Sequence, residues 1–223
     1  MLRRFFITGT DTDVGKTVAS TALVNAFVTQ GQRVIGHKPI SAGCEQSPEG
    51  LVNDDALQLI AQSNVTMPYH LVNPIALREP IAPHIAAAQC HQTITSAELI
   101  ANYAQLDHID ADVLISEGAG GWCLPINDSE LLPEVVSQLD IQVILVVAMR
   151  LGCLNHALLT QQAIEQSGCQ IAGWIANAPH PQLCMDENLA TLTARIDAPL
   201  LGIIPNVSNA KAAAQYLDIS LLD

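Results

Sequence analysis

Residues 9–17 read GTDTDVGKT and lie between an apolar segment and a segment with helical periodicity. A glycine-rich turn from a strand into a helix directs consecutive backbone N–H groups toward an anion, and the helix dipole adds positive potential. Gly15 would let the backbone approach a phosphate, Lys16 could reach the β- and γ-phosphates, and the Thr17 hydroxyl could coordinate Mg²⁺. The segment therefore predicts a nucleoside triphosphate site, against the alternative of an ordinary glycine-containing turn.

Three more residues could complete a phosphate and metal site. Lys38 follows the second apolar segment, where it could meet the γ-phosphate or an anionic substrate; an exposed loop lysine is the alternative. Glu117 ends another apolar segment, and three of the next four residues are glycines. Asp55, or less favourably Asp54, lies in the first turn of a predicted helix, where helix capping is the alternative. Since Mg²⁺ is commonly held by one or two carboxylates plus phosphates, we expect a magnesium site here.

Two later turns suggest further binding. Gly152, Cys153 and Asn155 lie between a buried segment and a helical one, so this helix start could hold a second anion such as a carboxylate. An ordinary turn with Asn155 as helix cap is equally compatible with the pattern. Asn177 ends a late apolar segment, where its carboxamide could donate to and accept from an adenine edge.

The elements that must position these residues alternate along the chain. Strands are expected at 3–8, 33–39, 112–117, 142–149, 170–178 and 199–205, and helices at 16–30, 53–62, 96–106 and 155–167. Several of the strands are continuously apolar, which is typical of a parallel sheet covered on both faces. We therefore expect one doubly wound α/β domain over residues 1–223, with ligands beyond the carboxyl ends of the strands. The longest irregular stretch is expected at 70–84, as a functional or packed loop.

Composition excludes several classes of function. The formal net charge of −13 disfavours binding to nucleic acid or to anionic membranes. The six cysteines show no C-x-x-C spacing, so neither a zinc site nor a disulfide framework is indicated. No apolar run approaches the length of a membrane span, and no leader pattern is present. A cytoplasmic location with reduced thiols is expected.

Seven segments of the sequence together resemble the dethiobiotin synthetases, the ATP-dependent ligases of biotin biosynthesis. They are GTDTDVGKT, HKPISAG, EGLVNDDAL, EGAGGW, LGCLNHALLTQQAI, GWIAN and APLLGIIP, and the resemblance covers nearly the whole chain. The five residues between Gly9 and Gly15, one more than the usual phosphate loop has, are the family's own pattern. The resemblance implies a phosphate-loop (P-loop) NTPase fold and a homodimer.

The resemblance also implies a reaction and roles for individual residues. Mg·ATP, CO₂ and 7,8-diaminopelargonate would give a cyclic urea, ADP and phosphate through a carbamate and a carbamic-phosphoric anhydride. Lys16 and Lys38 would be catalytic, and Thr17, Asp55 and Glu117 would hold Mg²⁺. The nucleotide would contact Asp13, Val14, Gly15, Lys16, Thr17, Val18, Asn177 and Pro205. The diamine would contact Ser41, Gly118, Ala119 and Gly120, and its carboxylate would reach Gly152, Cys153 and Asn155 of the partner subunit.

Two positions depart from the family pattern. Ala42 stands where the family usually has a Thr or Ser hydroxyl, and Ser41 is one step earlier. Asp13 stands where many relatives have Glu. Asp11 and Asp13 need not oppose the phosphates if their side chains turn toward metal waters, neighbouring amides or the diamine.

Other functions of the same fold remain as alternatives. A switching ATPase of the MinD and ParA type would carry an early lysine in the phosphate loop, but residues 10–14 contain none. The synthetase part of a cobyrinate amidase would be accompanied by a glutaminase domain. A pure nucleotide-binding module would show no diamine-dependent turnover.

Overall fold

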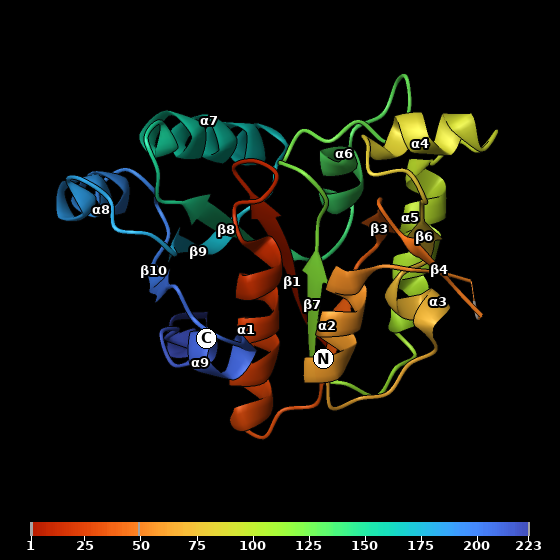
Figure 1. The fold of residues 1–223 in the computed structure, drawn as a ribbon, viewed down its shortest axis with the longest axis horizontal. Coiled ribbons are helices and arrows are strands. Elements are labelled where there is room, and N and C mark those ends of the chain that lie inside the picture. Colours follow the sequence, from red (N-terminus) through yellow and green to blue (C-terminus); the bar gives the residue numbers. More distant parts are fainter. Residues whose placement is uncertain (1, 49, 223) are drawn as a thin grey trace.

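The computed structural model describes residues 2–48 and 50–222, and its centre is a parallel β-sheet (Figure 1). Within these residues the main sheet has six strands in the order β10-β9-β8-β1-β7-β2, all parallel. The strands are β1 (Arg3–Gly9), β2 (Val34–His37), β7 (Val113–Glu117), β8 (Gln142–Ala148), β9 (Ile171–Ala178) and β10 (Leu200–Pro205). The predicted α/β fold with a mainly parallel sheet is confirmed.

Helices cover both faces of this sheet because its strands are apolar on both sides. Phe5 and Ile7 of β1 pack into one core cluster, and Phe6 between them packs into the other. The first face carries α1 (Lys16–Thr29), α2 (Asp54–Gln62), α9 (Ala210–Ala214) and the 3₁₀ helix η1 (Ile219–Leu222). The second face carries α5 (Ser96–Leu106), α6 (Leu132–Val136), α7 (Cys153–Gln166) and α8 (Met185–Thr193).

The strands and helices that the sequence predicts are all present, with ends that differ by two residues or fewer. The prediction of one irregular stretch at 70–84 was wrong. It contains most of α3 (Tyr69–Val72), the short strand β6 (Ile75–Ala76) and the start of α4 (Pro83–Gln89). β6 pairs with β3 (Ile40–Ser41), and β4 (Glu45–Ser47) pairs with β5 (Gly50–Val52). These elements are too short to show a period in the sequence.

Two expectations from composition concern the described part of the chain. All six cysteines are free, as the lack of C-x-x-C spacing indicated. Within residues 2–48 and 50–222, none of the helices combines the length and apolar character needed to cross a lipid bilayer.

Candidate functional site

The turn between β1 and α1 is held in one conformation by its neighbours. The amide of Thr10 donates to the Val146 carbonyl at 3.2 Å, which ties the start of the turn to β8. Asp13 and Gly15 have φ values of 56° and 93°, in the left-handed region. A Cβ at Gly9 would lie 2.4 Å from Cγ2 of Val14, so the turn can close only over a glycine. The sequence therefore folds here into a compact loop at the amino end of α1.

Asn177, at the end of β9, supports this loop from the side. Its Nδ2 donates to the Val14 carbonyl at 2.9 Å, and the residue is buried. A Cβ at Gly15 would lie 2.0 Å from the same Nδ2, so Gly15 is required by Asn177 as well as by its φ. The structure thus gives Asn177 a contact with the loop that the sequence did not predict, and its role toward adenine stays a prediction.

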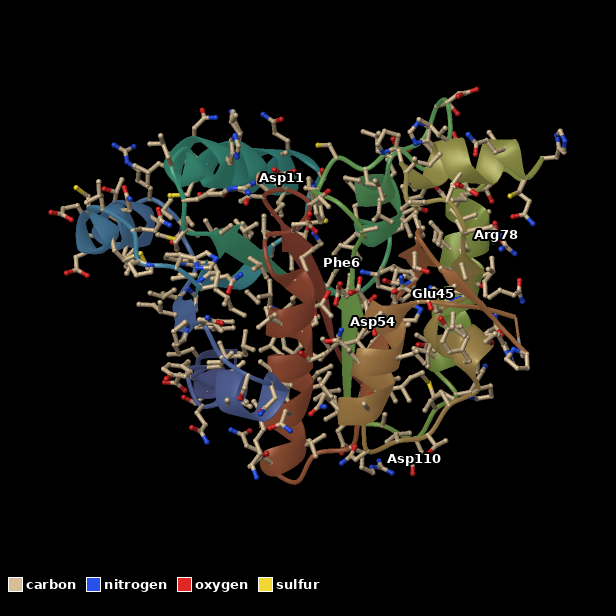
Figure 2. All side chains as sticks on the ribbon, in the orientation of Figure 1. Phe6, Asp11, Glu45, Asp54, Arg78 and Asp110 are labelled. Carbon is tan, nitrogen blue, oxygen red and sulfur yellow. The ribbon has the colours of Figure 1, made fainter. Side chains whose placement is uncertain are left out.

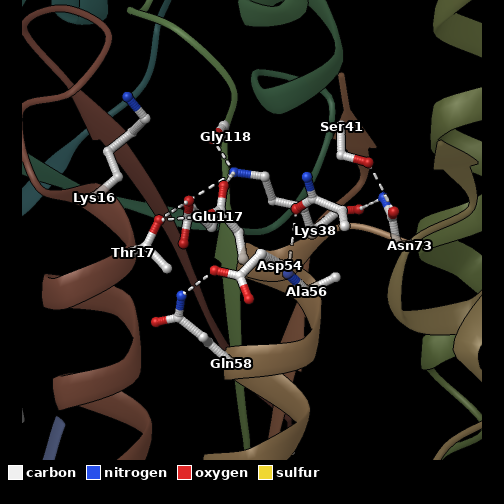
Figure 3. A network of polar contacts seen from close by, with 12 residues as sticks. Lys16, Thr17, Lys38, Ser41, Asp54, Ala56, Gln58, Asn73, Glu117 and Gly118 are labelled. Carbon is white, nitrogen blue, oxygen red and sulfur yellow. Dashed lines mark hydrogen bonds and ion pairs between the residues drawn. The ribbon is translucent and has the colours of Figure 1, made fainter. Parts of the chain in front are cut away.

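A cluster of polar and charged side chains lies beside the loop (Figure 3). We call it the charged cluster, and its four members, from four segments, are Thr17, Lys38, Asp55 and Glu117. Thr17 Oγ1 lies 2.9 Å from Asp55 Oδ1 and 3.0 Å from Glu117 Oε1. Lys38 Nζ donates to Asp55 Oδ2 at 2.8 Å, to Glu117 Oε1 at 2.6 Å and to the Gly118 carbonyl at 3.3 Å. The predicted metal residues and the second predicted lysine are therefore in direct contact.

Each member of the cluster is placed by the start or end of a regular element. Glu117 ends β7, Lys38 follows β2, and the amide of Lys38 donates to the Val72 carbonyl at 2.8 Å. Asn53 caps α2 by accepting from the Ala56 amide at 3.3 Å. Asp55 then faces the cluster, whereas Asp54 is exposed and accepts from Gln58 at 2.7 Å. The preference for Asp55 over Asp54 is supported by this geometry, and the capping role belongs to Asn53.

The charges in the cluster change the acidity of its members. Burial alone would lower the pKa of Lys38, but the charges of Glu117 and Asp55 outweigh it and the pKa is raised. Burial likewise opposes ionisation of Asp55, yet Lys38 and the Thr17 hydroxyl hold its pKa below the ordinary value. For Lys16, burial and then repulsion by Lys38 lower the pKa to about 8. A polyanion that enters the site would therefore meet two poorly solvated ammonium groups.

The oxygen atoms of the cluster fit a magnesium ion. The Thr17 hydroxyl has one proton but two carboxylate oxygens within 3.0 Å, and Glu117 Oε2 is buried without a hydrogen-bond partner among the described residues. Among residues 2–48 and 50–222, no group of three or more His, Cys, Asp or Glu side chains is arranged to hold a metal; the cluster has two carboxylates and a hydroxyl. Two carboxylates and a hydroxyl, completed by phosphate and water, are a usual shell for Mg²⁺.

A cavity of about 940 Å³ opens over the cluster. Its polar wall contains Lys16, Thr17, Lys38, Asp55 and Glu117. The rest of its wall includes Asp13, Gly15, Val18, Ser41, Ala42, Ala119, Gly120, Pro80, Ile81, Pro83, Leu124 and Pro125. The carboxyl ends of the strands thus enclose both a phosphate-type site and a partly apolar chamber next to it.

Comparisons with known proteins agree with this arrangement. A family model described as an AAA domain matches residues 3–214. An ATP-dependent dethiobiotin synthetase from Cellvibrio japonicus is 47% identical, over 99% of this chain and 98% of that protein. One from Escherichia coli K12 is 45% identical over the full length of both. The chain belongs to the dethiobiotin synthetase family.

Solved structures with much lower sequence identity share the fold of this chain. The septum site-determining protein MinD from Pyrococcus horikoshii, complexed with Mg-ADP, has a TM-score of 0.65 at 16% identity, over all of this chain and 95% of that one. FtsY from Physcomitrella patens chloroplasts has a TM-score of 0.52 at 16% identity, over all of this chain and 64% of that one. These P-loop NTPases share the fold alone, so the sequence relatives, and not MinD, identify the family.

Other residues implied by the resemblance to the dethiobiotin synthetase family lie outside the cavity wall. Val14 is buried under the loop, and Gly118 supports Lys38 through its carbonyl. Pro205 ends β10 and is paired with Ala178, on the side of the loop where Asn177 lies. The three residues at the start of α7, Gly152, Cys153 and Asn155, also do not line the cavity of their own chain. A role for them in binding the diamine therefore needs a second subunit.

Ser41 lines the cavity, but its hydroxyl is already bonded. Its Oγ donates to Asn73 Oδ1 at 2.7 Å (Figure 3). The same Oγ lies 3.1 Å from Cys44 Sγ. Asn73 Nδ2 in turn donates to the Lys38 carbonyl at 2.7 Å. Sequence reasoning missed Asn73, because it lies in the stretch at 70–84 that was expected to be irregular. Ser41 therefore supports the Lys38 backbone through Asn73, and its role toward the substrate stays a prediction.

The side chain of Asp11 takes one of the orientations expected for the acidic residues of the loop, toward a neighbouring amide. Its Oδ1 accepts from the Thr12 amide at 2.8 Å, and its Oδ2 accepts from Arg150 at 2.8 Å. Its carbonyl accepts from Lys16 Nζ at 2.9 Å. The side chain of Asp11 is thus turned to a neighbouring amide and to an arginine. Asp13 lines the cavity and is exposed, so its role stays a prediction.

Proposed function

We propose that this chain closes a cyclic urea on 7,8-diaminopelargonate with CO₂ and Mg·ATP, and releases ADP and phosphate. One observation carries the proposal: Thr17, Lys38, Asp55 and Glu117 meet within hydrogen-bonding distance beside the loop, in a cavity large enough for a phosphate chain and a diamine. Residues 1–223 would act as a single domain.

The bonds and protons of each step balance. One neutral amine nitrogen adds to CO₂ and releases its proton to water, and the carbamate oxygen attacks the γ-phosphorus with loss of ADP. The second neutral amine then attacks the carbonyl carbon, the bond from that carbon to the phosphate oxygen breaks as the ring closes, and the leaving phosphate takes up the amine proton. The carbamate, the mixed anhydride and the phosphates are all anionic, so positioning and charge neutralisation are the main requirements of catalysis.

The residues of the cluster match those requirements. The loop amides from Asp13 to Thr17 would bind the phosphates, and Lys16 would leave the Asp11 carbonyl to join them. Lys38 would hold the carbamate and the transferring phosphate. Thr17, Asp55 and Glu117 would hold Mg²⁺, which neutralises charge on the phosphates when bound. On the far side of the loop, Val18, Asn177 and Pro205 would contact the nucleoside.

The diamine would lie along Gly118, Ala119 and Gly120 with Ser41 at the side, in the chamber next to the cluster. Its carboxylate would reach Gly152, Cys153 and Asn155 of a second copy, because these residues do not line the cavity of their own chain. The side chain of Leu151, next to this turn, is fully exposed, and Leu159 on the same helix is 57% exposed. Apolar side chains in such positions are compatible with a covered homodimer face.

The test of the reaction is ADP release with Mg·ATP and bicarbonate, with and without 7,8-diaminopelargonate. ADP that forms only with the diamine, together with a cyclic urea product, supports the proposal. ATP hydrolysis at the same rate with and without the diamine contradicts the ligase function and favours a switching ATPase of the MinD type.

A complementation experiment tests the shared site. Lys16→Ala and Asn155→Ala protomers are each expected to be weakly active alone. In a mixed dimer, one of the two sites would contain both native residues, so mixing should restore part of the wild-type rate. Sedimentation as a monomer, or no gain on mixing, would place the carboxylate site elsewhere.

A further inference from the structure

Three polar side chains form a buried group directly behind the charged cluster. Ser116 Oγ lies 3.0 Å from His37 Nδ1 and 2.5 Å from the hydroxyl of Tyr103. The rings of His37 and Tyr103 meet edge to face, with centroids 4.9 Å apart. His37 and Ser116 are wholly buried and Tyr103 is 5% exposed. These residues come from β2, β7 and α5, and neither the sequence analysis nor the proposed reaction uses them.

Stability of the fold alone does not explain these three buried polar side chains. It adjoins the apolar layer formed by Ile35, Leu99, Leu106 and Leu114. His37 Nε2 is buried without a hydrogen-bond partner among the described residues. A buried unpaired polar atom destabilises the folded state, and apolar groups of the same shape are often no less stable. Burial lowers the pKa of His37 to about 3, so the imidazole is neutral.

The geometry connects this group to the site on the other face of the sheet. His37 and Ser116 are paired in register across β2 and β7. Each is followed by a residue of the cluster, Lys38 and Glu117, whose side chains meet at 2.6 Å. Successive residues of a strand point to opposite faces. Any slip or spread of the two strand ends would therefore change the separation of the ammonium group and the carboxylate.

We propose that Ser116, held by His37 and Tyr103, is a positioning residue that fixes Glu117 and Lys38 for the metal ion and the phosphates. The inference rests on the proposed function for what those two residues bind. It assigns a role in catalysis to three residues that touch neither substrate nor metal. Hydrogen-bond partners of metal ligands typically change metal affinity or activity 10- to 100-fold when they are removed, and this group acts one residue further away, through the strand backbone, so we expect the lower end of that range.

Binding of Mn²⁺ with ADP, followed by electron paramagnetic resonance, tests the inference without turnover. Tyr103→Phe and Ser116→Ala each remove one hydroxyl, and we expect Mn²⁺ affinity in the nucleotide complex to fall about 10-fold or more. kcat should fall as well. Tm should change little in Tyr103→Phe, which leaves Ser116 paired with His37, whereas Ser116→Ala leaves two buried polar atoms unpaired and should also lower Tm. Ser116→Thr keeps the hydroxyl and should recover affinity. Ser20→Ala is the matched control, since Ser20 Oγ is buried in α1 without a hydrogen-bond partner among the described residues.

The outcomes separate this inference from the proposed function. Wild-type protein that fails to bind Mn²⁺ with ADP overturns the metal site and this inference with it. Wild-type binding with Mn²⁺ affinity in both variants equal to that of Ser20→Ala overturns the inference alone, whatever happens to Tm. If Ser116→Ala does not fold, Tyr103→Phe decides, because it keeps the packed ring.

Discussion

Two turns of this molecule have the same local geometry and different surroundings. β1 leads into α1, the neighbouring parallel strand β8 leads into α7, and both helices have 14 residues. Both are capped by a glycine with φ of 93°, Gly15 in the first turn and Gly152 in the second. Each turn therefore presents the positive end of a helix dipole, although in the second turn the Cys153 amide already donates to the Arg150 carbonyl at 2.9 Å.

The surroundings make one turn self-contained and leave the other open. A Cβ at Gly15 would collide with Asn177, and the first turn of α1 faces Asp55 and Glu117. A Cβ at Gly152 would meet no heavy atom of the described residues within 4 Å, apart from its chain neighbours and its own helix. Both turns thus place a helix amino end behind a glycine, but the neighbouring strands supply charged side chains only to the first.

An ion pair joins the two turns. Arg150, two residues before Gly152, donates to Asp11 at 2.8 Å, and both side chains are about half exposed. Figure 2 shows Asp11 in the loop beyond the carboxyl end of β1. The five variants below test how far the first turn differs from the second.

Lys16→Ala should have the largest effect, because only the first turn carries a buried ammonium group. We expect kcat to fall about 100- to 1000-fold, the usual cost of losing one preorganised charge donor. ADP release with the diamine measures it, and Lys211→Ala, at an exposed lysine of α9, is the control. Equal rates in the two variants would contradict a phosphate role for Lys16.

Glu117→Gln removes one of the carboxylates that set the first turn apart. We expect about a 100-fold fall in turnover at fixed Mg²⁺, with partial recovery at higher Mg²⁺ concentration, because a ligand and the partner of Lys38 are both weakened. A magnesium titration of the rate is the measurement. A normal half-saturation concentration would mean that the metal lies elsewhere.

Gly15→Ala should weaken nucleotide binding by about 10-fold or more, since a strained φ alone costs about 1–3 kcal/mol and 1.4 kcal/mol is tenfold. The displaced Asn177 adds to that cost. Calorimetric titration with Mg·ADP measures the affinity. Wild-type affinity would show that the loop adapts and that the brace from β9 is dispensable.

Gly152→Ala is the matched change in the second turn. Its φ is the same but nothing obstructs the new methyl group, so unfolding free energy should fall by only about 1–2 kcal/mol. Mg·ADP affinity should stay at the wild-type value, while the KM for the diamine rises. A loss of ADP affinity equal to that of Gly15→Ala would remove the distinction between the turns.

Arg150→Gln should have the smallest effect. Exposed ion pairs contribute about 0–1 kcal/mol, so thermal unfolding should shift by a few degrees at most. High salt should shrink the difference between this variant and the wild type. A larger, salt-insensitive loss would indicate that the two turns are coupled more tightly than their exposure suggests.

Much of this arrangement could be predicted from the sequence, because local signals and a parallel topology agree. Residues 9–17 carry the turn chemistry itself, and the apolar segments before Lys38 and Glu117 place both at the carboxyl edge of the sheet. The family resemblance then assigned roles by position. The roles of individual residues stay predictions until variants are measured.

The rest depends on contacts between distant residues. Asp54 and Asp55 differ only in the direction they take from α2, which Asn53 and the packing of the helix decide. Ser41 and Asn73 meet because β3 pairs with β6, a pairing of two residues that has no period. His37 and Ser116 left a weak signal as polar residues at buried strand positions, but only the register of β2 and β7 brings them together.

The position of β1 in the sheet has a consequence for synthesis of the chain. β1 pairs with β7 and β8, and its partners begin at residues 113 and 142. At about 5–20 residues per second, the ribosome needs on the order of 10 s to make that intervening chain. During that time the loop after Gly9 cannot form its contacts with Val146 and Glu117, because those residues have not yet been synthesised. The nascent chain therefore contains its phosphate motif early but can bind nucleotide only late. Until β7 and β8 are made, the apolar strand β1 has neither of its partners and needs protection from aggregation.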